Sequence, residues 1–358
     1  MLFIARATLY KDRGGDTTQV LGTAEHLRRL DIAVDVRLTN EDIDYAGYDL
    51  LHFFNIIRPA DILKHVRLSG KPYVVSTIFV DYSEYDKKAR TGPARFLFRL
   101  LSGDLIEYLK VVARMLVNGE KVVSPEYLLY GQRRSIRKII QGASLLLPNS
   151  ASEYRRLVRH YRMEQHYRII PNAMETALFV PPGADHERDP KLVLCVGRIE
   201  GRKDQLDLIR AINGTDYRLL IIGSPSANQV KYYETCRNEA GPNISFIPAL
   251  SQAELAAYYA KAQVHVLPSW FETTGLSTLE AAAMGCRIVI TDKGDTREYF
   301  GDHAFYCEPG SPASILDAVR RAAAASFDGT LQRLIFSEYT WQCTAERTAA
   351  GYAELGLR

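Results

Sequence analysis

The sequence of 358 residues contains no long hydrophobic run, few cysteines and no strong excess of charge of one sign. No apolar stretch approaches the roughly 18 residues that a membrane-spanning helix requires, so the sequence predicts no bilayer crossing. The apolar run at residues 1–6 is interrupted by a charged residue too early for a secretory signal, so it is better explained as a strand. We therefore expect a cytoplasmic protein.

Cysteine is scarce, and its pattern argues against paired thiols. There are five cysteines, an odd number, and none forms a CxxC pair. Cys195 and Cys286 lie in or beside apolar runs typical of buried strands, where a thiol behaves as a small hydrophobic group. We expect all five to be reduced and to have structural roles.

The length predicts two domains, because 358 residues exceed what one hydrophobic core usually supports. Short apolar runs alternate with longer helical patterns in both halves, which indicates α/β domains with parallel sheets and helices on both faces. A polar segment rich in proline, residues 172–190, separates the halves. The expected strands are residues 2–5, 34–38, 50–54, 73–77 and 144–147 in the first half, and 192–196, 218–222, 244–247, 264–267 and 287–291 in the second.

The most informative stretch contains two glutamates, Glu272 and Glu280, separated by seven residues. It follows an expected strand and enters a helix at about Gly275, whose first amides can bind a phosphate. Carboxylates accept hydrogen bonds from sugar and ribose hydroxyls, so one sugar nucleotide could span both glutamates. Each glutamate alone also fits an ordinary helix surface.

Two basic residues, Arg198 and Lys203, follow the expected strand that ends at Val196. In doubly wound sheets, ligands bind outside the carboxyl ends of the strands. There an arginine and a lysine can neutralise a diphosphate. Taken alone, however, this segment also fits a solvated loop beside a helix.

These segments, with Pro171-Asn172-Ala173 and Gly14-Gly15, resemble in order and spacing the motifs of the retaining GT-B glycosyltransferases that use nucleotide sugars, the family 4 type or glycosyl transferases group 1. The family includes sucrose and glycogen synthases. The resemblance implies an α/β fold with two Rossmann-like, doubly wound domains facing across a cleft. Residues 1–172 with a C-terminal helix in 341–358 would form the acceptor-side domain, and residues 173–340 the domain that binds the nucleotide sugar.

The resemblance also implies roles for individual residues. Arg198, Lys203 and Glu272 would be catalytic: the cations stabilise the departing diphosphate and Glu272 holds the transferred sugar. Glu280 would bind the ribose. Retention of anomeric configuration and independence of metal are implied in the same way. The remaining residues expected to contact the sugar donor are Gly15, Thr274, Gly275 and Leu276.

Three residues are candidates for the acceptor side. Asp16 follows the glycine pair, and Asp81 follows the strand after which many relatives carry a histidine. This chain has no histidine there, so that role cannot be carried over. A solvent-facing loop explains Asp81 as well, and His52 fits a buried core position equally well.

No metal site is expected. Asp42 and Asp44 superficially match a pair of metal ligands, but their polar surroundings favour a surface turn. We therefore expect no cofactor, with a nucleoside diphosphate sugar as substrate and the cations replacing a metal.

Residues 87–138 are markedly basic, with twelve basic and four acidic side chains, a local net charge of +8. Apolar stretches at helical spacing accompany this charge, and basic amphipathic helices bind anionic lipid surfaces. A solvated helical insertion near the acceptor explains the pattern equally well. Nucleic acid is not expected as a partner, because no nucleic-acid-binding module accompanies the charge.

The sequence thus predicts a retaining glycosyltransferase that uses a UDP- or GDP-sugar and a glycan or lipid-linked acceptor. Surface polysaccharide or lipopolysaccharide synthesis, at the inner face of a membrane, is the expected setting. Two alternatives stay open: an inactive relative that binds a nucleotide sugar for regulation or scaffolding, and a hydrolase or epimerase on the same fold. The sequence does not specify the base, the sugar, the acceptor, the linkage formed or the oligomeric state.

Overall fold

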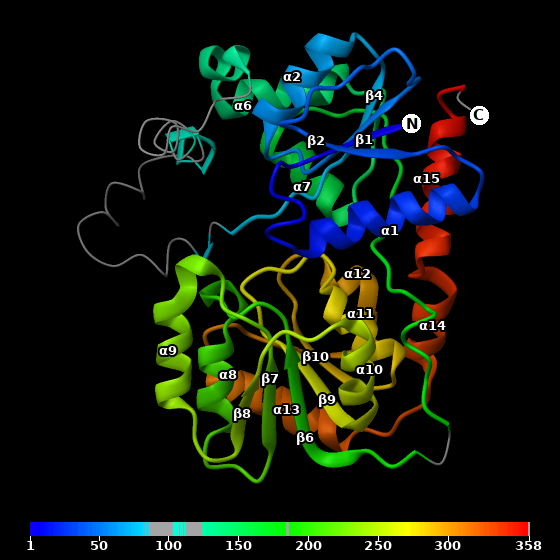
Figure 1. Cartoon of the computed structure of the whole chain (residues 1–358). Helices are drawn as coiled ribbons and strands as arrows, with labels where there is room; N and C mark the ends of the chain where they lie inside the picture. The colour runs from blue at the N-terminus through cyan, green and yellow to red at the C-terminus, as the bar shows by residue number, and fades with distance from the viewer. Residues whose placement is uncertain are drawn as a thin grey trace. The chain divides into compact units, whose positions relative to one another are not determined.

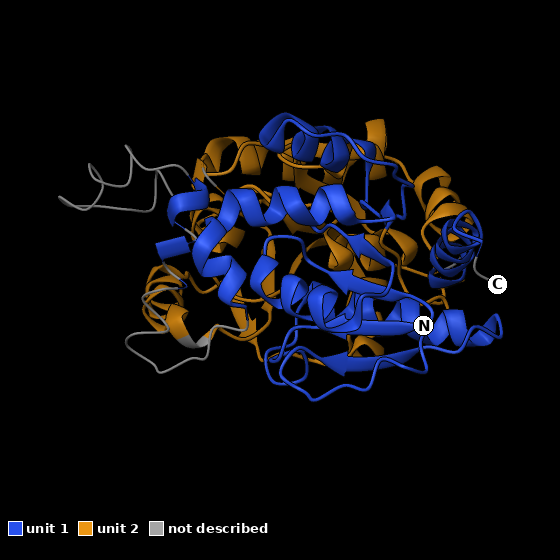
Figure 2. Ribbon diagram, turned by 90° about the horizontal axis from the view of Figure 1, so that it is seen from above, with its two compact units in different colours: residues 1–79, 86–171, 341–358 blue, residues 80–85, 172–340 orange. Residues whose placement is uncertain are grey.

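The computed structural model describes residues 1–82, 84–85, 103–106, 108–109, 111, 124–183 and 186–356. The chain forms two compact units, coloured separately in Figure 2. The first contains Met1–Phe79, Asp86–Pro171 and Trp341–Arg358, and the second contains Val80–Tyr85 and Asn172–Thr340. The sequence prediction also divides the chain near residue 172, but it leaves Val80–Tyr85 in the first domain.

The first unit is built on a five-stranded parallel sheet with the strand order β2-β1-β3-β4-β5. The strands β1, β3 and β4 are buried along their whole length, as expected for a parallel sheet covered on both faces. All five strands lie within the predicted ranges. Their bounds are β1 (Leu2–Ala5), β2 (Asp35–Leu38), β3 (Leu51–Phe54), β4 (Tyr73–Ser76) and β5 (Leu145–Leu146).

The helices of the first unit include the last helix of the chain, which packs against the first. Figure 1 shows these two, α1 and α15, side by side. Gly22 permits the contact, because a Cβ atom there would lie 2.7 Å from the indole of Trp341. The helices are α1 (Gly15–Arg29), α2 (Pro59–Ser69), α6 (Pro125–Gly142), α7 (Ala151–Tyr161) and α15 (Trp341–Ala353).

The second unit is built on a six-stranded parallel sheet with the order β11-β10-β9-β6-β7-β8. Five strands were predicted. The sixth, β11, a run of four residues at a sheet edge, was not predicted. The bounds are β6 (Asp189–Val196), β7 (Arg218–Ile222), β8 (Ile244–Ile247), β9 (Ala262–Leu267), β10 (Arg287–Thr291) and β11 (Ala304–Cys307).

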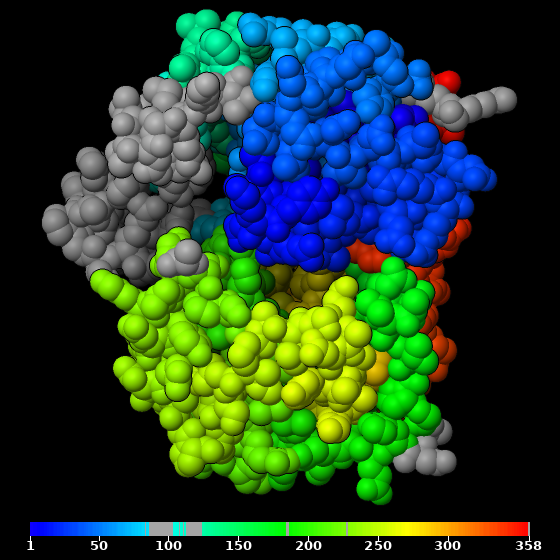
Figure 3. All heavy atoms as spheres, in the orientation of Figure 1, coloured from blue at the N-terminus to red at the C-terminus, as the bar shows by residue number. Residues whose placement is uncertain are grey.

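Helices cover this second sheet, and the outer faces of α9 and α10 form part of the surface seen in yellow-green and yellow in Figure 3. Three short 3-10 turns, Gly201–Lys203, Ala227–Gln229 and Gly301–His303, complete the unit. The helices are α8 (Gln205–Ile212), α9 (Val230–Glu239), α10 (Gln252–Lys261), α11 (Leu276–Ala283), α12 (Thr296–Phe300), α13 (Pro312–Ala324) and α14 (Thr330–Glu338).

Two further sequence expectations concern burial and membrane crossing. Cys195, Cys236, Cys286 and Cys307 are buried, in agreement with a structural role for these thiols. Within the described part of the chain, no helix combines the length and the apolar character needed to span a bilayer.

The contact between α1 and α15 gives a direct test of the packing in the first unit. Gly22→Val adds two methyl groups where the Trp341 ring already lies, and overpacking of this kind costs about 1–3 kcal/mol. We therefore expect a lower guanidinium midpoint for unfolding of the first unit. Gly47→Ala is the matched control, because a Cβ atom there meets nothing within 4 Å. Equal midpoints for the two variants would contradict the packing described here.

Candidate functional site

Three neighbouring strands of the second unit, β6, β9 and β10, carry the candidate residues on the loops after their carboxyl ends. Backbone hydrogen bonds tie these loops together. The amide of Trp270 donates to the carbonyl of Arg202 at 2.9 Å, and the amide of Glu272 donates to the carbonyl of Lys293 at 3.1 Å. The loops are therefore held in one cluster by the main chain, before any side chain contributes.

Gly294 is required for the closest of these approaches. Its φ of +102° is unfavourable for other residues, and a Cβ atom there would lie 1.9 Å from the carbonyl oxygen of Glu272. Only glycine allows the loop after β10 to lie against Glu272. The backbone position of Glu272 is thus fixed from two sides.

The centre of the cluster is an ion pair between Lys203 and Glu272, in which Lys203 Nζ contacts Glu272 Oε1. The side chains are 20% and 8% exposed, respectively. Burial alone would lower the pKa of Lys203, but Glu272, with smaller contributions from Tyr82 and Glu200, outweighs burial, so the pKa is raised above its usual value. Lys203 is therefore a fixed, charged ammonium group.

Arg198 lies half-buried on the same turn as Lys203. Its backbone carbonyl accepts a hydrogen bond from the side-chain amide of Gln205 at 2.8 Å, which links the turn to α8. The alternative of a solvated loop does not fit Asp204, which is buried and accepts a hydrogen bond from the Gly310 amide at 2.6 Å. Burial raises the pKa of Asp204 to about 7.

The start of α11 presents polar groups without partners. Gly275 precedes the helix with a left-handed φ of +72°, and Leu276 is the first helical residue. The hydroxyls of Thr274 and Thr278 are buried, and neither has a hydrogen-bond partner among the described residues. Buried polar groups are usually satisfied, so these hydroxyls and the first amides of α11 fit an absent polar ligand.

Glu280 lies one turn further along α11 and is buried, not exposed on the helix surface. Its carboxylate accepts hydrogen bonds from the Gln252 amide at 2.7 Å and from the Tyr259 hydroxyl at 2.9 Å. Burial raises the pKa of Glu280 to about 7, although both hydrogen bonds act in the opposite direction. Sequence reasoning missed Gln252 and Tyr259, because nothing in the sequence of α10 connects them with Glu280.

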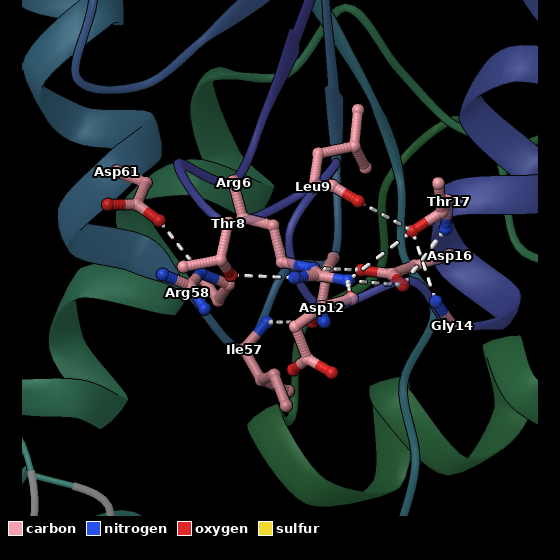
Figure 4. Close-up of polar contacts among 11 residues, drawn as sticks. Arg6, Thr8, Leu9, Asp12, Gly14, Asp16, Thr17, Ile57, Arg58 and Asp61 are labelled. Carbon is pink, nitrogen blue, oxygen red and sulfur yellow. Dashed lines mark hydrogen bonds and ion pairs between the residues drawn. The ribbon is translucent and has the colours of Figure 1, made fainter. Parts of the chain in front are cut away.

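In the first unit, the loop after β1 is held by an ion pair between Arg6 and Asp16, shown in Figure 4. Arg6 Nε lies 2.5 Å from Asp16 Oδ2, and the Thr17 amide donates to Asp16 Oδ1 at 2.9 Å. Gly15 opens α1 directly beside this carboxylate. Asp16 thus maintains the shape of the glycine loop, and the prediction that it lies on the acceptor side stays untested.

His52 lies in the core of the first unit. The Nδ1 atom lies 2.6 Å from the Tyr352 hydroxyl, Nε2 lies 2.9 Å from the Ser76 hydroxyl, and the ring stacks on Phe54. Burial lowers the pKa of His52 to about 3. Both ring nitrogens are occupied within the core, so His52 is not proposed as an acceptor-side residue.

The other predicted polar residues lie at the surface. Asp81 is exposed and belongs to the second unit. Asp44 accepts a hydrogen bond from the Ala46 amide in an exposed turn that also contains Asp42. In the described ranges, no three His, Cys, Asp or Glu side chains are grouped to hold a metal ion. Most of the basic segment before residue 124 lies outside the described residues.

Comparisons with known proteins agree with this geometry. Residues 181–335 match the family model of the glycosyl transferases group 1. The matched residues all lie in the second unit, which is therefore similar to this family. A D-inositol 3-phosphate glycosyltransferase of Pseudarthrobacter chlorophenolicus is 32% identical over 204 residues, 52% of this chain and 47% of the relative. A glycogen synthase of Mycobacterium tuberculosis is 29% identical over 198 residues, 51% of this chain and 47% of the relative. The chain thus spans about half the length of these curated relatives.

Solved structures share the fold over 99% of this chain. The sucrose-phosphate synthase of Thermosynechococcus elongatus superimposes with a TM-score of 0.75 at 17% identity, covering 99% of this chain and 98% of that one. HepE of Anabaena, solved with UDP, gives a TM-score of 0.70 at 13% identity and covers 99% of both chains. These likenesses confirm the GT-B fold predicted from the sequence.

The buried Glu280 carboxylate predicts a specific dependence of stability on pH. Its pKa is about 7 in the folded protein and near 4.5 when unfolded, so between these values the folded state binds the extra proton. The contribution of Glu280 to the free energy of unfolding therefore falls as the pH rises from about 4.5 to 7. Glu280→Gln cannot ionise, and we expect the variant to gain stability relative to wild type across that range. Urea titrations at several pH values measure the difference, and a constant difference would contradict the burial of this carboxylate.

Proposed function

We propose that this chain is a retaining glycosyltransferase that moves a sugar from a UDP- or GDP-sugar to a glycan or lipid-linked acceptor. The observation that carries the proposal is the largely buried pair of Lys203 and Glu272 beside the start of α11, within the residues that match the group 1 family model. HepE, one of the structural neighbours, has been solved with UDP and with UDP-glucose, which supports the choice of a nucleotide sugar.

The proposed chemistry follows from the charges that develop as the sugar leaves. The bond between the anomeric carbon and the phosphate oxygen breaks, and a bond to the acceptor oxygen forms while the acceptor hydroxyl gives its proton to an oxygen of the departing diphosphate. Negative charge grows on the diphosphate, where Lys203, Arg198 and the first amides of α11 stabilise it. We propose that the diphosphate replaces Glu272 as the partner of Lys203, which frees Glu272 to accept hydrogen bonds from the sugar.

Two finer parts of the proposal rest on the same unit. We propose that the ribose hydroxyls bind Glu280, with Gln252 and Tyr259 orienting the carboxylate. We also propose that no metal is needed, since Lys203 and Arg198 supply the positive charge near the leaving group; transfer in excess chelator is the expected result. Surface polysaccharide or lipopolysaccharide assembly in the cytoplasm remains the proposed setting.

The names of the relatives widen the range of acceptors. A glycosyltransferase of D-inositol 3-phosphate and a glycogen synthase stand among them, so a phosphorylated polyol and a glucan both belong in an acceptor screen. Slow hydrolysis of the sugar nucleotide without acceptor would argue against an inactive binding relative. Analysis of the sugar product separates transfer from hydrolysis or epimerisation.

The ion pair of Lys203 and Glu272 allows a prediction of how substitutions at these two positions change turnover. Removing one partner of a buried ion pair leaves an uncompensated charge that costs about 3–5 kcal/mol, so single alanine variants would mix stability with activity. The test is therefore the near-isosteric double variant Lys203→Met/Glu272→Gln, which removes both charges at once. Loss of transition-state stabilisation of this kind usually lowers turnover about 100-fold or more. Release of nucleoside diphosphate, with circular dichroism to check folding, is the measurement. Lys191→Met, which removes a surface lysine paired with Asp216, is the control. Near-normal turnover in the folded double variant would refute the assignment.

We also propose that the first unit binds anionic membranes, with the described part of the basic segment contributing through α6. Leu128 and Leu129 are 38% and 76% exposed on this helix, and Arg134, Arg137 and Lys138 are exposed further along it. Exposed apolar side chains before the kink at Gly131 and basic ones after it both suit the boundary of an anionic bilayer, where each basic residue contributes about 1 kcal/mol.

Sedimentation with liposomes tests this proposal. We expect binding to phosphatidylserine vesicles at low salt, weaker binding to phosphatidylcholine vesicles, and at least threefold less binding for Leu128→Ser/Leu129→Ser. Val230→Ser removes a comparably exposed side chain, 48%, from the second unit and should bind as wild type does. A wild-type protein that stays in the supernatant with anionic vesicles would end the membrane proposal.

A further inference from the structure

A short segment that follows β4 in the sequence, Val80–Tyr85, belongs to the second unit, although β4 itself belongs to the first. Two contacts anchor its far end. Both carboxylate oxygens of Glu84 lie 2.8 Å from Lys293 Nζ, on the loop after β10. The Tyr85 side chain lies against Gly201, where a Cβ atom would be 2.1 Å from the Tyr85 hydroxyl. The segment is therefore fixed to the same loops that hold Lys203 and Glu272.

Tyr82 lies within this anchored segment, and its ring is held by two neighbours. The guanidinium of Arg202 lies 4.4 Å from the ring centroid, in cation–π geometry. The ring of Phe271 packs edge-on, with centroids 6.0 Å apart. Arg202 is itself oriented by Glu200 at 2.9 Å. These neighbours immediately precede Lys203 and Glu272 in the sequence, so Tyr82 contacts both of the loops that carry the ion pair.

The hydroxyl of Tyr82 has no hydrogen-bond partner in the described part of the chain, although the ring is half-buried. Its surroundings are highly charged. Burial raises the pKa of the Tyr82 hydroxyl. The nearby cations Lys203 and Arg202 lower this pKa, whereas the carboxylates Glu272 and Glu200 raise it further. The hydroxyl is thus a polar group within electrostatic reach of both members of the ion pair, and no residue that the structure describes uses its hydrogen-bonding capacity.

We infer that Tyr82 contacts the transferred sugar and contributes to the selection of the sugar donor. A phenol hydroxyl both donates and accepts, which suits sugar hydroxyls, whereas the diphosphate already has Lys203 and Arg198 as cationic partners. The inference rests on the function proposed above. Many relatives carry a histidine in this segment, and this chain does not, so the role of that histidine could not be carried over. Tyr82 would be the residue of this segment that contacts the ligand in this chain.

The test compares Tyr82→Phe with wild type, because this variant keeps the ring and its contact with Arg202 but removes the hydroxyl. Binding is measured by calorimetry with three pairs: UDP-glucose and UDP, GDP-mannose and GDP, and ADP-glucose and ADP. For the pair that wild type binds, we expect about threefold to tenfold weaker binding of the sugar nucleotide, the usual effect of one lost hydrogen bond. Binding of the free diphosphate should stay within about twofold. Tyr82→Leu, which also removes the ring, should weaken binding of the sugar nucleotide further.

Tyr233→Phe is the matched control, because it removes another half-buried hydroxyl of the second unit, on α9, and should bind as wild type does. Unchanged affinity of Tyr82→Phe for the sugar nucleotide, or an equal loss for the free diphosphate, would overturn the contact with the sugar while leaving the proposed function intact. A wild-type protein that binds none of the six compounds would overturn the proposed function, and this inference with it.

Discussion

The ion pair of Lys203 and Glu272 is the interaction on which the rest of the second unit's site depends. Two charges lie largely out of water, and each is stable there only because the other is present. A diphosphate offers Lys203 a second anion, and sugar hydroxyls offer Glu272 new hydrogen-bond donors. We therefore propose that the pair is a preformed site whose two halves exchange their mutual contact for contacts with one ligand.

The fold holds this pair through the main chain. The strands β6 and β9 are neighbours, so the loops that follow them begin side by side. The hydrogen bond from Trp270 to Arg202 then joins these loops directly, and Gly294 lets the loop after β10 close against Glu272. Side chains such as Tyr82 and Arg202 pack onto a backbone arrangement that is already fixed. This order suits a site that must place charge accurately before its ligand binds.

Much of this architecture could be predicted from the sequence, because it depends on local patterns. Strands of a parallel sheet are short, largely apolar runs, and ten of the described strands were located in this way. The proximity of Lys203 and Glu272, 69 residues apart, followed from the rule that ligands bind at the carboxyl ends of neighbouring strands. The helix start at Gly275 followed from a glycine directly before an apolar, alanine-rich run.

The remaining features depend on packing between distant segments, which leaves no local pattern. Gln252 and Tyr259 reach Glu280 from another helix, and their sequence is that of any helix surface. His52 could equally have been a ligand or a core residue until its stacking on Phe54 and its bond to Tyr352 were known. Tyr82 lies in a segment whose sequence gives no sign that it belongs with the second unit.

A crystal structure with a bound nucleoside diphosphate sugar is the most direct test of the central claim. We expect a phosphate oxygen within hydrogen-bond distance of Lys203 Nζ, and we expect the Glu272 carboxylate to contact a sugar hydroxyl instead of the lysine. A nucleotide bound elsewhere on the chain, or one bound here while Lys203 and Glu272 remain paired, would contradict that claim.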